Sequence, residues 1–244
     1  MTTSALSDVL RSELLKIRTS PATWGFAAVI VLLTALNTSL ALGDPYTQIA
    51  TEAGVGHIFT AGRDFAVLFI AFGAIGAASE FRHQTAVPTF LTTPARSRVL
   101  AAKALAHACA GLLIALACVA LQIALALPWL ASSGEPVVPW DAAVAEPALT
   151  AVLAGLAYGA LGVALGSLLR NQVVALMVTF GWFAVAENAL ASVTPGVSRF
   201  LPGGVLSGTD QADLLASPAT IGLLGAYAIA LCVIAARTTL RRDI

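Results

Sequence analysis

Long apolar runs alternate with short polar intervals along this 244-residue chain. A helix needs about 20 apolar residues, at 1.5 Å rise per residue, to cross a hydrocarbon core of about 30 Å. Six stretches meet this requirement and predict an all-α integral membrane protein with six transmembrane helices in one domain over residues 1–244. The predicted spans cover residues 22–42, 59–79, 99–127, 146–169, 173–191 and 219–236.

Composition agrees with this pattern. Hydrophobic residues make up 58% of the chain and charged residues 11%, whereas soluble domains carry about 25% charge. The formal net charge is zero, so no overall basic character indicates a nucleic-acid partner. The cysteines (Cys109, Cys118, Cys232) lie in apolar runs and the histidines (His57, His83, His107) are scattered, so we expect neither a disulfide framework nor a metal site.

The basic residues predict the orientation. If the N-terminus is cytoplasmic, 11 of the 13 Lys and Arg residues fall in inner segments, and only Arg63 and Arg199 fall outside. Cytoplasmic loops of membrane proteins carry an excess of Lys and Arg. We therefore expect a multi-pass membrane protein with both termini in the cytoplasm.

The first 21 residues differ from the spans that follow. At 100° per residue, an apolar face forms along residues 4–18, which predicts an amphipathic helix lying under the inner leaflet. The alternative is that a cytoplasmic partner protein packs on this face. Glu13 projects into the middle of the apolar face, and a carboxylate there needs a partner. Lys16, three residues later, is the nearest candidate.

Residues 80–106 form a charged interval between the second and third predicted spans. Pro88 and Pro94 interrupt the helical pattern, so we expect a short helix crosswise to the spans and then a turn. The letters E-F-R-H-Q-T at 80–85, followed by T-F-L-T-T-P-A-R-S-R-V-L-A-A-K-A-L-A at 89–106, closely resemble the membrane subunit of type-two ABC exporters. S-E-L-L-K-I-R-T-S at 12–20 is similar to the elbow helix of the same family.

This resemblance implies a function. Residues 80–98 would be the coupling loop, whose helix docks in a groove of a separate ATPase subunit. Two permease copies, as a homodimer in the bacterial inner membrane, would form the pathway above two cytosolic ATPases. ATP and Mg would be held by the ATPase and no cofactor by this chain. The implied coupling residues are Glu13, Glu80, Phe81, Arg82, His83, Thr85, Pro94, Arg96 and Arg98.

The chain carries no G-x-x-x-x-G-K-[ST] phosphate-binding motif. The resemblance therefore implies a transport subunit rather than an enzyme, with ATP hydrolysed by a partner chain. Spans rich in Ala, Leu, Val and Thr favour a hydrophobic or amphipathic cargo, such as a drug, a peptide or a lipid-like molecule. One alternative is an ATPase-independent secondary transporter or channel, which predicts charges near the membrane midplane and inverted repeats. Another is a membrane enzyme or a non-transporting membrane anchor.

Polar residues inside predicted spans are candidates for function. Thr34, Asn37 and Thr38 share one face of the first span, and Glu187 and Asn188 lie near the outer end of the fifth. We expect these residues to line the pathway or an outer gate, although Glu187 could instead be a helix-end carboxylate in the headgroup zone. The resemblance also implies a re-entrant extracellular hairpin over residues 192–217.

Glycines recur along the fourth predicted span. Gly155, Gly159, Gly162 and Gly166 lie on one face, where the absence of side chains lets helix backbones approach closely. This face could pack against another span of the same chain or against a second subunit.

Overall fold

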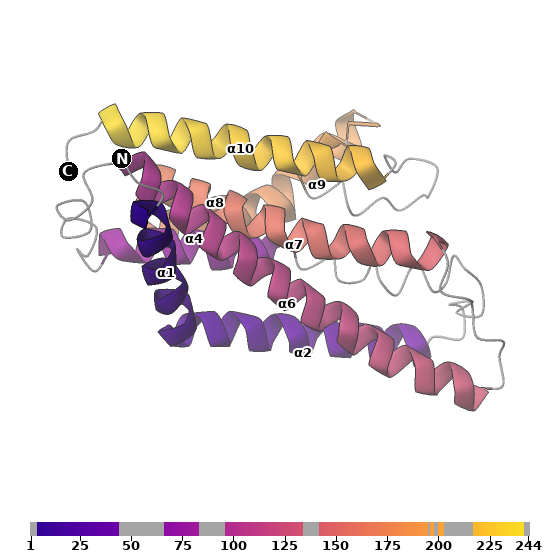
Figure 1. Ribbon diagram of the computed structural model, residues 1–244. Coiled ribbons are helices and arrows are strands. Elements are labelled where there is room, and N and C mark those ends of the chain that lie inside the picture. Colours follow the sequence, from indigo (N-terminus) through magenta and orange to yellow (C-terminus); the bar gives the residue numbers. More distant parts are fainter. Residues whose placement is uncertain are drawn as a thin grey trace.

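The computed structural model describes residues 4–43, 66–82, 96–133, 142–194, 196–197, 200–202 and 217–241. All regular structure in these ranges is helical. The elements are α1 (Ser4–Thr19), α2 (Pro21–Gly43), α4 (Ala66–Arg82), α6 (Arg96–Ser133), α7 (Ala142–Leu169), α8 (Gln172–Gly181), the π-helix η2 (Trp182–Ala186), α9 (Glu187–Val193) and α10 (Ser217–Arg241). Figure 1 shows α2, α6, α7 and α10 running along the length of the molecule, with α1 lying across one end, which we call the α1 end.

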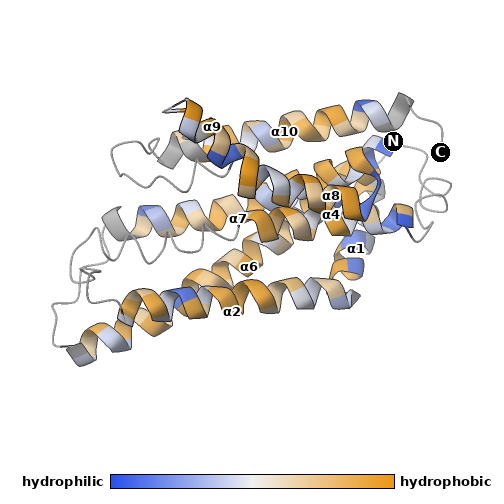
Figure 2. Ribbon diagram, turned by 180° about the vertical axis from the view of Figure 1, so that it is seen from behind, coloured by the Kyte–Doolittle hydropathy of each residue, from blue (hydrophilic) through white to orange (hydrophobic). Residues whose placement is uncertain are grey.

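Five helical segments are long and apolar enough to cross a membrane, judged by length and composition, and they indicate a membrane protein. They are Pro21–Gly43, Arg96–Ser132, Ala145–Leu169, Gln172–Leu190 and Ile221–Thr238, and they match the first, third, fourth, fifth and sixth predicted spans. Figure 2 shows apolar residues along the lengths of α2 and α6, in contrast to the more hydrophilic α1. Residues 59–65 of the second predicted span lie outside the described residues, and α4 covers the remainder. The second span, and with it the total of six, stays a prediction.

Helix α7 occupies the centre of the bundle and packs against α4, α6 and α10. A Cβ atom added to Gly162 would lie 2.2 Å from the carbonyl oxygen of Ile70 in α4. A Cβ added to Gly155 would lie 2.8 Å from the carbonyl oxygen of Gly111 in α6. The glycine face of the fourth predicted span therefore packs within the chain, because only glycine allows helices to approach this closely.

Large apolar side chains remain exposed on the outer helices. Leu32 of α2, Met177 of α8 and Ile229 of α10 are 68%, 70% and 67% exposed. A soluble protein would bury most such residues, whereas lipid tails solvate them without cost. These surfaces agree with the membrane assignment made from composition.

Candidate functional site

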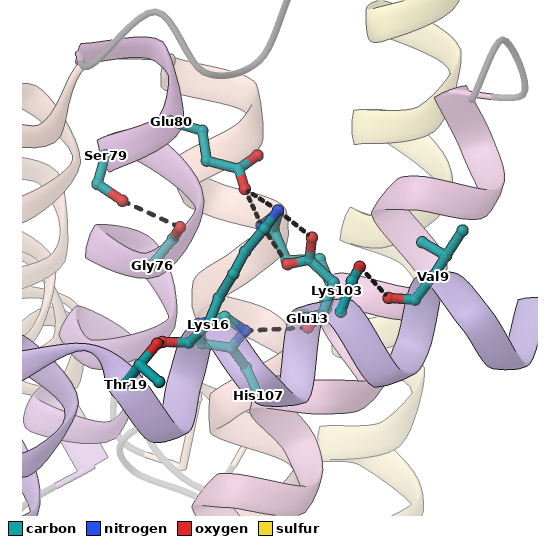
Figure 3. Close-up of polar contacts among 10 residues, drawn as sticks. Val9, Glu13, Lys16, Thr19, Gly76, Ser79, Glu80, Lys103 and His107 are labelled. Atoms are coloured by element: carbon teal, nitrogen blue, oxygen red, sulfur yellow. Dashed lines mark hydrogen bonds and ion pairs between the residues drawn. The ribbon is translucent and has the colours of Figure 1, made fainter. Parts of the chain in front are cut away.

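Four charged side chains meet at the α1 end of the bundle, and we call them the ionic cluster: Glu13, Lys16, Glu80 and Lys103 (Figure 3). The Nζ atom of Lys103 lies 2.5 Å from Oε2 of Glu13 and 2.8 Å from Oε1 of Glu80. The Nζ atom of Lys16 lies 2.6 Å from Oε1 of Glu13 and 2.8 Å from Oε1 of Glu80. Each carboxylate thus binds both ammonium groups, and the cluster joins α1, the last turn of α4 and the start of α6.

The cluster resolves the problem posed by Glu13. This residue is only 1% exposed, because the face of α1 that carries it packs against α6. Its predicted partner, Lys16, is confirmed as a hydrogen-bond donor to it. Lys103 is a second partner that the sequence did not predict, since it lies 90 residues away along the chain. A buried carboxylate is stable only when it is paired in this way.

The charges in the cluster balance, and this sets the protonation of its outer members. Burial alone would raise the pKa of the Glu80 carboxyl, but the neighbouring Lys103 and Lys16 ammonium groups outweigh burial and lower that pKa below its ordinary value. Burial likewise would lower the pKa of Lys16, yet its bonds to Glu13 and Glu80 hold that pKa above its ordinary value. Both groups are therefore charged at neutral pH.

His107 packs one helical turn beyond Lys103 and adds a second tie between α6 and α4. Its Nδ1 atom lies 3.0 Å from the carbonyl oxygen of Lys103, and its ring centroid is 5.1 Å from that of Phe72. Gly76 makes room for the ring, since a Cβ at this position would lie 2.0 Å from the His107 Nε2 atom. No motif in the sequence predicted these contacts of His107.

Two predicted coupling residues at the end of α4 face the turn between α7 and α8. The Cζ atom of Arg170 lies 5.3 Å from the centroid of the Phe81 ring. Arg82 donates from Nη1 to Oε1 of Gln172 at 3.1 Å. The three last residues of α4 therefore make contacts on two sides, with the ionic cluster through Glu80 and with the α7–α8 turn through Phe81 and Arg82.

The remaining predicted coupling residues divide into two groups. Arg96 is half-buried and Arg98 is exposed, both in the first turn of α6. His83, Thr85 and Pro94 lie outside the described residues, as does the coupling helix expected around them.

The polar residues of the first predicted span lie mainly between helices. Thr34 and Thr38 are 1% and 0% exposed, and Asn37 is half-buried. The Thr34 hydroxyl donates to the carbonyl oxygen of Ile30 at 2.8 Å and lies 3.4 Å from the Cys118 sulfur of α6. Within a single chain, Thr34 is therefore a packing residue at the α2–α6 contact.

Glu187 and Asn188 follow a π-helix that the hydrophobic pattern did not predict. The Trp182 ring nitrogen donates to Oε1 of Glu187 at 2.7 Å, and Glu187 is 8% exposed. The Asn188 side-chain nitrogen contacts the carbonyl oxygens of Phe183 and Ala184 at 3.3 and 3.0 Å. A π-turn leaves backbone carbonyls poorly paired, so Asn188 compensates for it. Such turns occur frequently at functional sites.

Two tyrosines hold the short described segment 200–202 against the bundle. The Tyr158 hydroxyl of α7 donates to the carbonyl oxygen of Pro202. The Tyr227 hydroxyl of α10 donates to the carbonyl oxygen of Phe200 at 2.8 Å. This segment belongs to the predicted re-entrant hairpin, most of which lies outside the described residues. We call residues 182–202, with their contacts, the α9 region.

No protein-family model matches the chain, and no curated protein matches it. Within the described ranges, no group of three or more His, Cys, Asp or Glu side chains is placed to hold a metal ion. The sequence motifs and the geometry of the α1 end are the observations that bear on function.

Proposed function

We propose that this chain is the permease subunit of an ATP-binding-cassette exporter. Two copies form the pathway for a hydrophobic or amphipathic cargo, and two separate ATPase subunits supply the energy. ATP and Mg bind to those subunits. The coupling loop at residues 80–98, from the end of α4 to the start of α6, is the element that meets the ATPase, and both termini lie on the same, cytoplasmic side.

The ionic cluster is the observation that carries this proposal. Its members lie on α1, on the end of α4 and on the start of α6, so it joins the two helices that flank residues 83–95. A buried network with paired charges resists separation of its members, because breaking one pair leaves an uncompensated buried charge. A force applied to segment 83–95 would therefore move α1, α4 and α6 together. This is the rigid connection that an externally driven transporter needs between its ATPase and its spans.

The contacts also divide the roles of the predicted coupling residues. Glu13 and Glu80 are engaged within the chain, so we assign them a positioning role rather than direct contact with the ATPase. Arg98 is exposed at the start of α6 and is available to a partner protein. Exposed charges at the rim of an interface contribute to partner recognition with little effect on the stability of the free chain.

Purification of the tagged chain from its native membranes tests the proposal. We expect an ABC ATPase to co-purify with the chain in equal amounts. Arg98→Glu should reduce the amount of bound ATPase at least about tenfold, since a like-charge contact costs several kcal/mol in an interface. Arg237→Glu is the matched control, because Arg237 is also an exposed arginine and lies within the last five residues of α10. That end of α10 is at the α1 end of the bundle (Figure 1).

The outcomes separate the candidate functions. Loss of the ATPase in the Arg98 variant, with an unchanged thermal unfolding temperature, supports docking at this position. Equal loss in both variants would indicate a general charge effect and would contradict it. A wild-type chain that carries no ATPase at all would favour an ATPase-independent transporter or a membrane anchor.

A further inference from the structure

The turn between α7 and α8 is built from very few residues. α7 ends at Leu169 and α8 begins at Gln172, as the sequence predicts for a tight helical hairpin. The backbone N–H of Arg170 donates to the carbonyl oxygen of Gly166 at 2.9 Å, which terminates α7. Asn171 then caps α8, since its side-chain oxygen accepts from the N–H groups of Val173 and Val174 at 3.0 and 3.2 Å.

Arg170 has an unusual backbone conformation for its residue type. Its φ angle is 52°, in the left-handed region where a Cβ atom makes unfavourable contacts. Glycine is the residue that this position of a helix end favours. The turn alone does not explain an arginine at this position. Its side chain does, because the guanidinium group lies over the Phe81 ring.

The turn therefore contacts the end of α4 through Phe81 and Arg82, the two residues that follow Glu80 of the ionic cluster. A guanidinium group over an aromatic face is attracted by the negative charge density of the ring. The bond from Arg82 to Gln172 adds a second contact between the same two elements. The last residues of α4, directly before segment 83–95, are thus joined to α1 and α6 on one side and to α8 on the other.

Beyond the turn, α8 packs along α4 and continues without interruption into the π-helix and α9. Within this run, the Trp182 ring nitrogen donates to Glu187, and the Asn188 side-chain nitrogen donates to the carbonyl oxygen of Ala184 in the π-helix. A displacement of α4 that reaches Arg170 therefore has a continuous helical route to Glu187. Packed helices and rigid elements with such contacts are the physical carriers of coupling between distant sites.

We infer that Arg170 is a positioning residue that joins the end of α4 to the α8–α9 helix through the Phe81 ring. The inference rests on the proposed function and deepens it, because it assigns to the α7–α8 turn the transfer of ATPase-driven motion to the region around Glu187. The strain at Arg170 is then retained for the contact that its side chain makes.

Arg170→Gly separates this role from the role of the turn. Glycine adopts the observed φ freely, so the turn is kept or improved while the ring contact is lost. The reporter is Trp182 fluorescence, in a background where Trp24, Trp129 and Trp140 are replaced by Phe. The full complex with its co-purified ATPase, in phospholipid nanodiscs, is compared before and after addition of Mg-ATP.

We expect Mg-ATP to change the Trp182 fluorescence of the parent complex. Arg170 and Phe81 are both half-buried, and Arg170→Gly should reduce that change at least about two- to fivefold, the lower range for one cation–ring contact. Phe81→Leu should give the same reduction, and the double variant no further one. Arg170→Lys keeps the charge without the planar group and should give an intermediate value.

Asn171→Ala is the matched control. It removes the cap of α8 and should lower the unfolding temperature, yet it leaves the Phe81 contact and should keep the ATP response. A full response in Arg170→Gly, or an equal loss in Asn171→Ala, would overturn the inference while leaving the proposed function intact. A parent complex with no ATPase or no ATP response would overturn both.

Discussion

The α1 end and the α9 region solve the problem of holding polar groups in an apolar bundle in different ways. At the α1 end, four charged side chains from three helices pair with one another. In the α9 region, two tyrosine hydroxyls hold the backbone of a short segment. The first arrangement joins whole helices, and the second attaches a segment to helices that are already packed.

This difference predicts different responses to perturbation. Removing one member of a buried ionic network leaves a charge without its partner, which is costly. Removing a tyrosine hydroxyl leaves a neutral carbonyl unpaired, which costs less. The contacts at the α1 end should therefore be the harder ones to break, and those in the α9 region should break first when the chain is destabilised.

The largest expected effect is the loss of Lys103. Lys103→Met removes the ammonium group that binds both carboxylates and leaves Glu13 buried with Lys16 alone. We expect a loss of about 3–5 kcal/mol in the free energy of unfolding, as for other broken buried ion pairs. Thermal unfolding of the purified chain in detergent measures it.

Lys16→Met is the control, because the side chain of Lys16 is 46% exposed and solvent screens its contribution. Its expected cost is about 1 kcal/mol or less. Combining Lys103→Met with Glu13→Gln should recover part of the loss, since the uncompensated charge is then gone. Equal costs for the two lysine variants would contradict the view that burial, rather than charge alone, makes the ionic cluster strong.

The contacts of the ionic cluster that depend on local spacing could be predicted from the sequence. The partner of Glu13 at three residues' distance follows from helix geometry, and the candidate spans follow from the length of the apolar runs. Lys103 could not be assigned because its contact depends on how α1 crosses α6, which no periodicity reports. Its position in the first part of a predicted span was the available signal, because a charge there requires a partner.

The α9 region was harder to predict for a different reason. A π-helix adds one residue to a turn without changing the apolar composition that marks a span, so the pattern over residues 173–191 gave no sign of it. The tyrosine contacts join α7 and α10 to a segment far along the chain, with Tyr158 and Pro202 44 residues apart. The letters Thr-Pro-Gly at 194–196 are typical of a helix end, and α9 ends at Val193, but such letters do not indicate which residues hold the chain beyond that end.

Loss of a tyrosine hydroxyl gives the next largest effect. Tyr158 is 1% exposed, so Tyr158→Phe leaves the Pro202 carbonyl without this donor in a buried setting and should cost about 1–2 kcal/mol. Tyr227 is less buried, and Tyr227→Phe should cost about 0.5–1 kcal/mol. Thermal unfolding in detergent orders these variants against Lys103→Met. A Tyr158 variant less stable than the Lys103 variant would reverse the comparison between the two regions.

Acidic pH gives the smallest effect and separates the regions by chemistry. The pKa of Glu80 is lowered in the folded chain, so its contribution to stability is present above the ordinary pKa of about 4.3 and is lost as the pH falls through the lower, folded value. Lys16, whose pKa is raised, keeps its contribution until the pH exceeds its ordinary value of about 10.4, so it does not oppose this trend in acid. Between these limits the contributions of both groups are constant with pH.

Below about pH 4 we expect a loss of about 1 kcal/mol or less from Glu80, measured as the unfolding temperature across a pH series. Glu80→Gln should reduce this dependence, whereas Tyr158→Phe should shift the whole curve without changing its shape, because a tyrosine hydroxyl does not titrate in acid. A Tyr158 variant with an altered acid limb would show that the two regions are not independent.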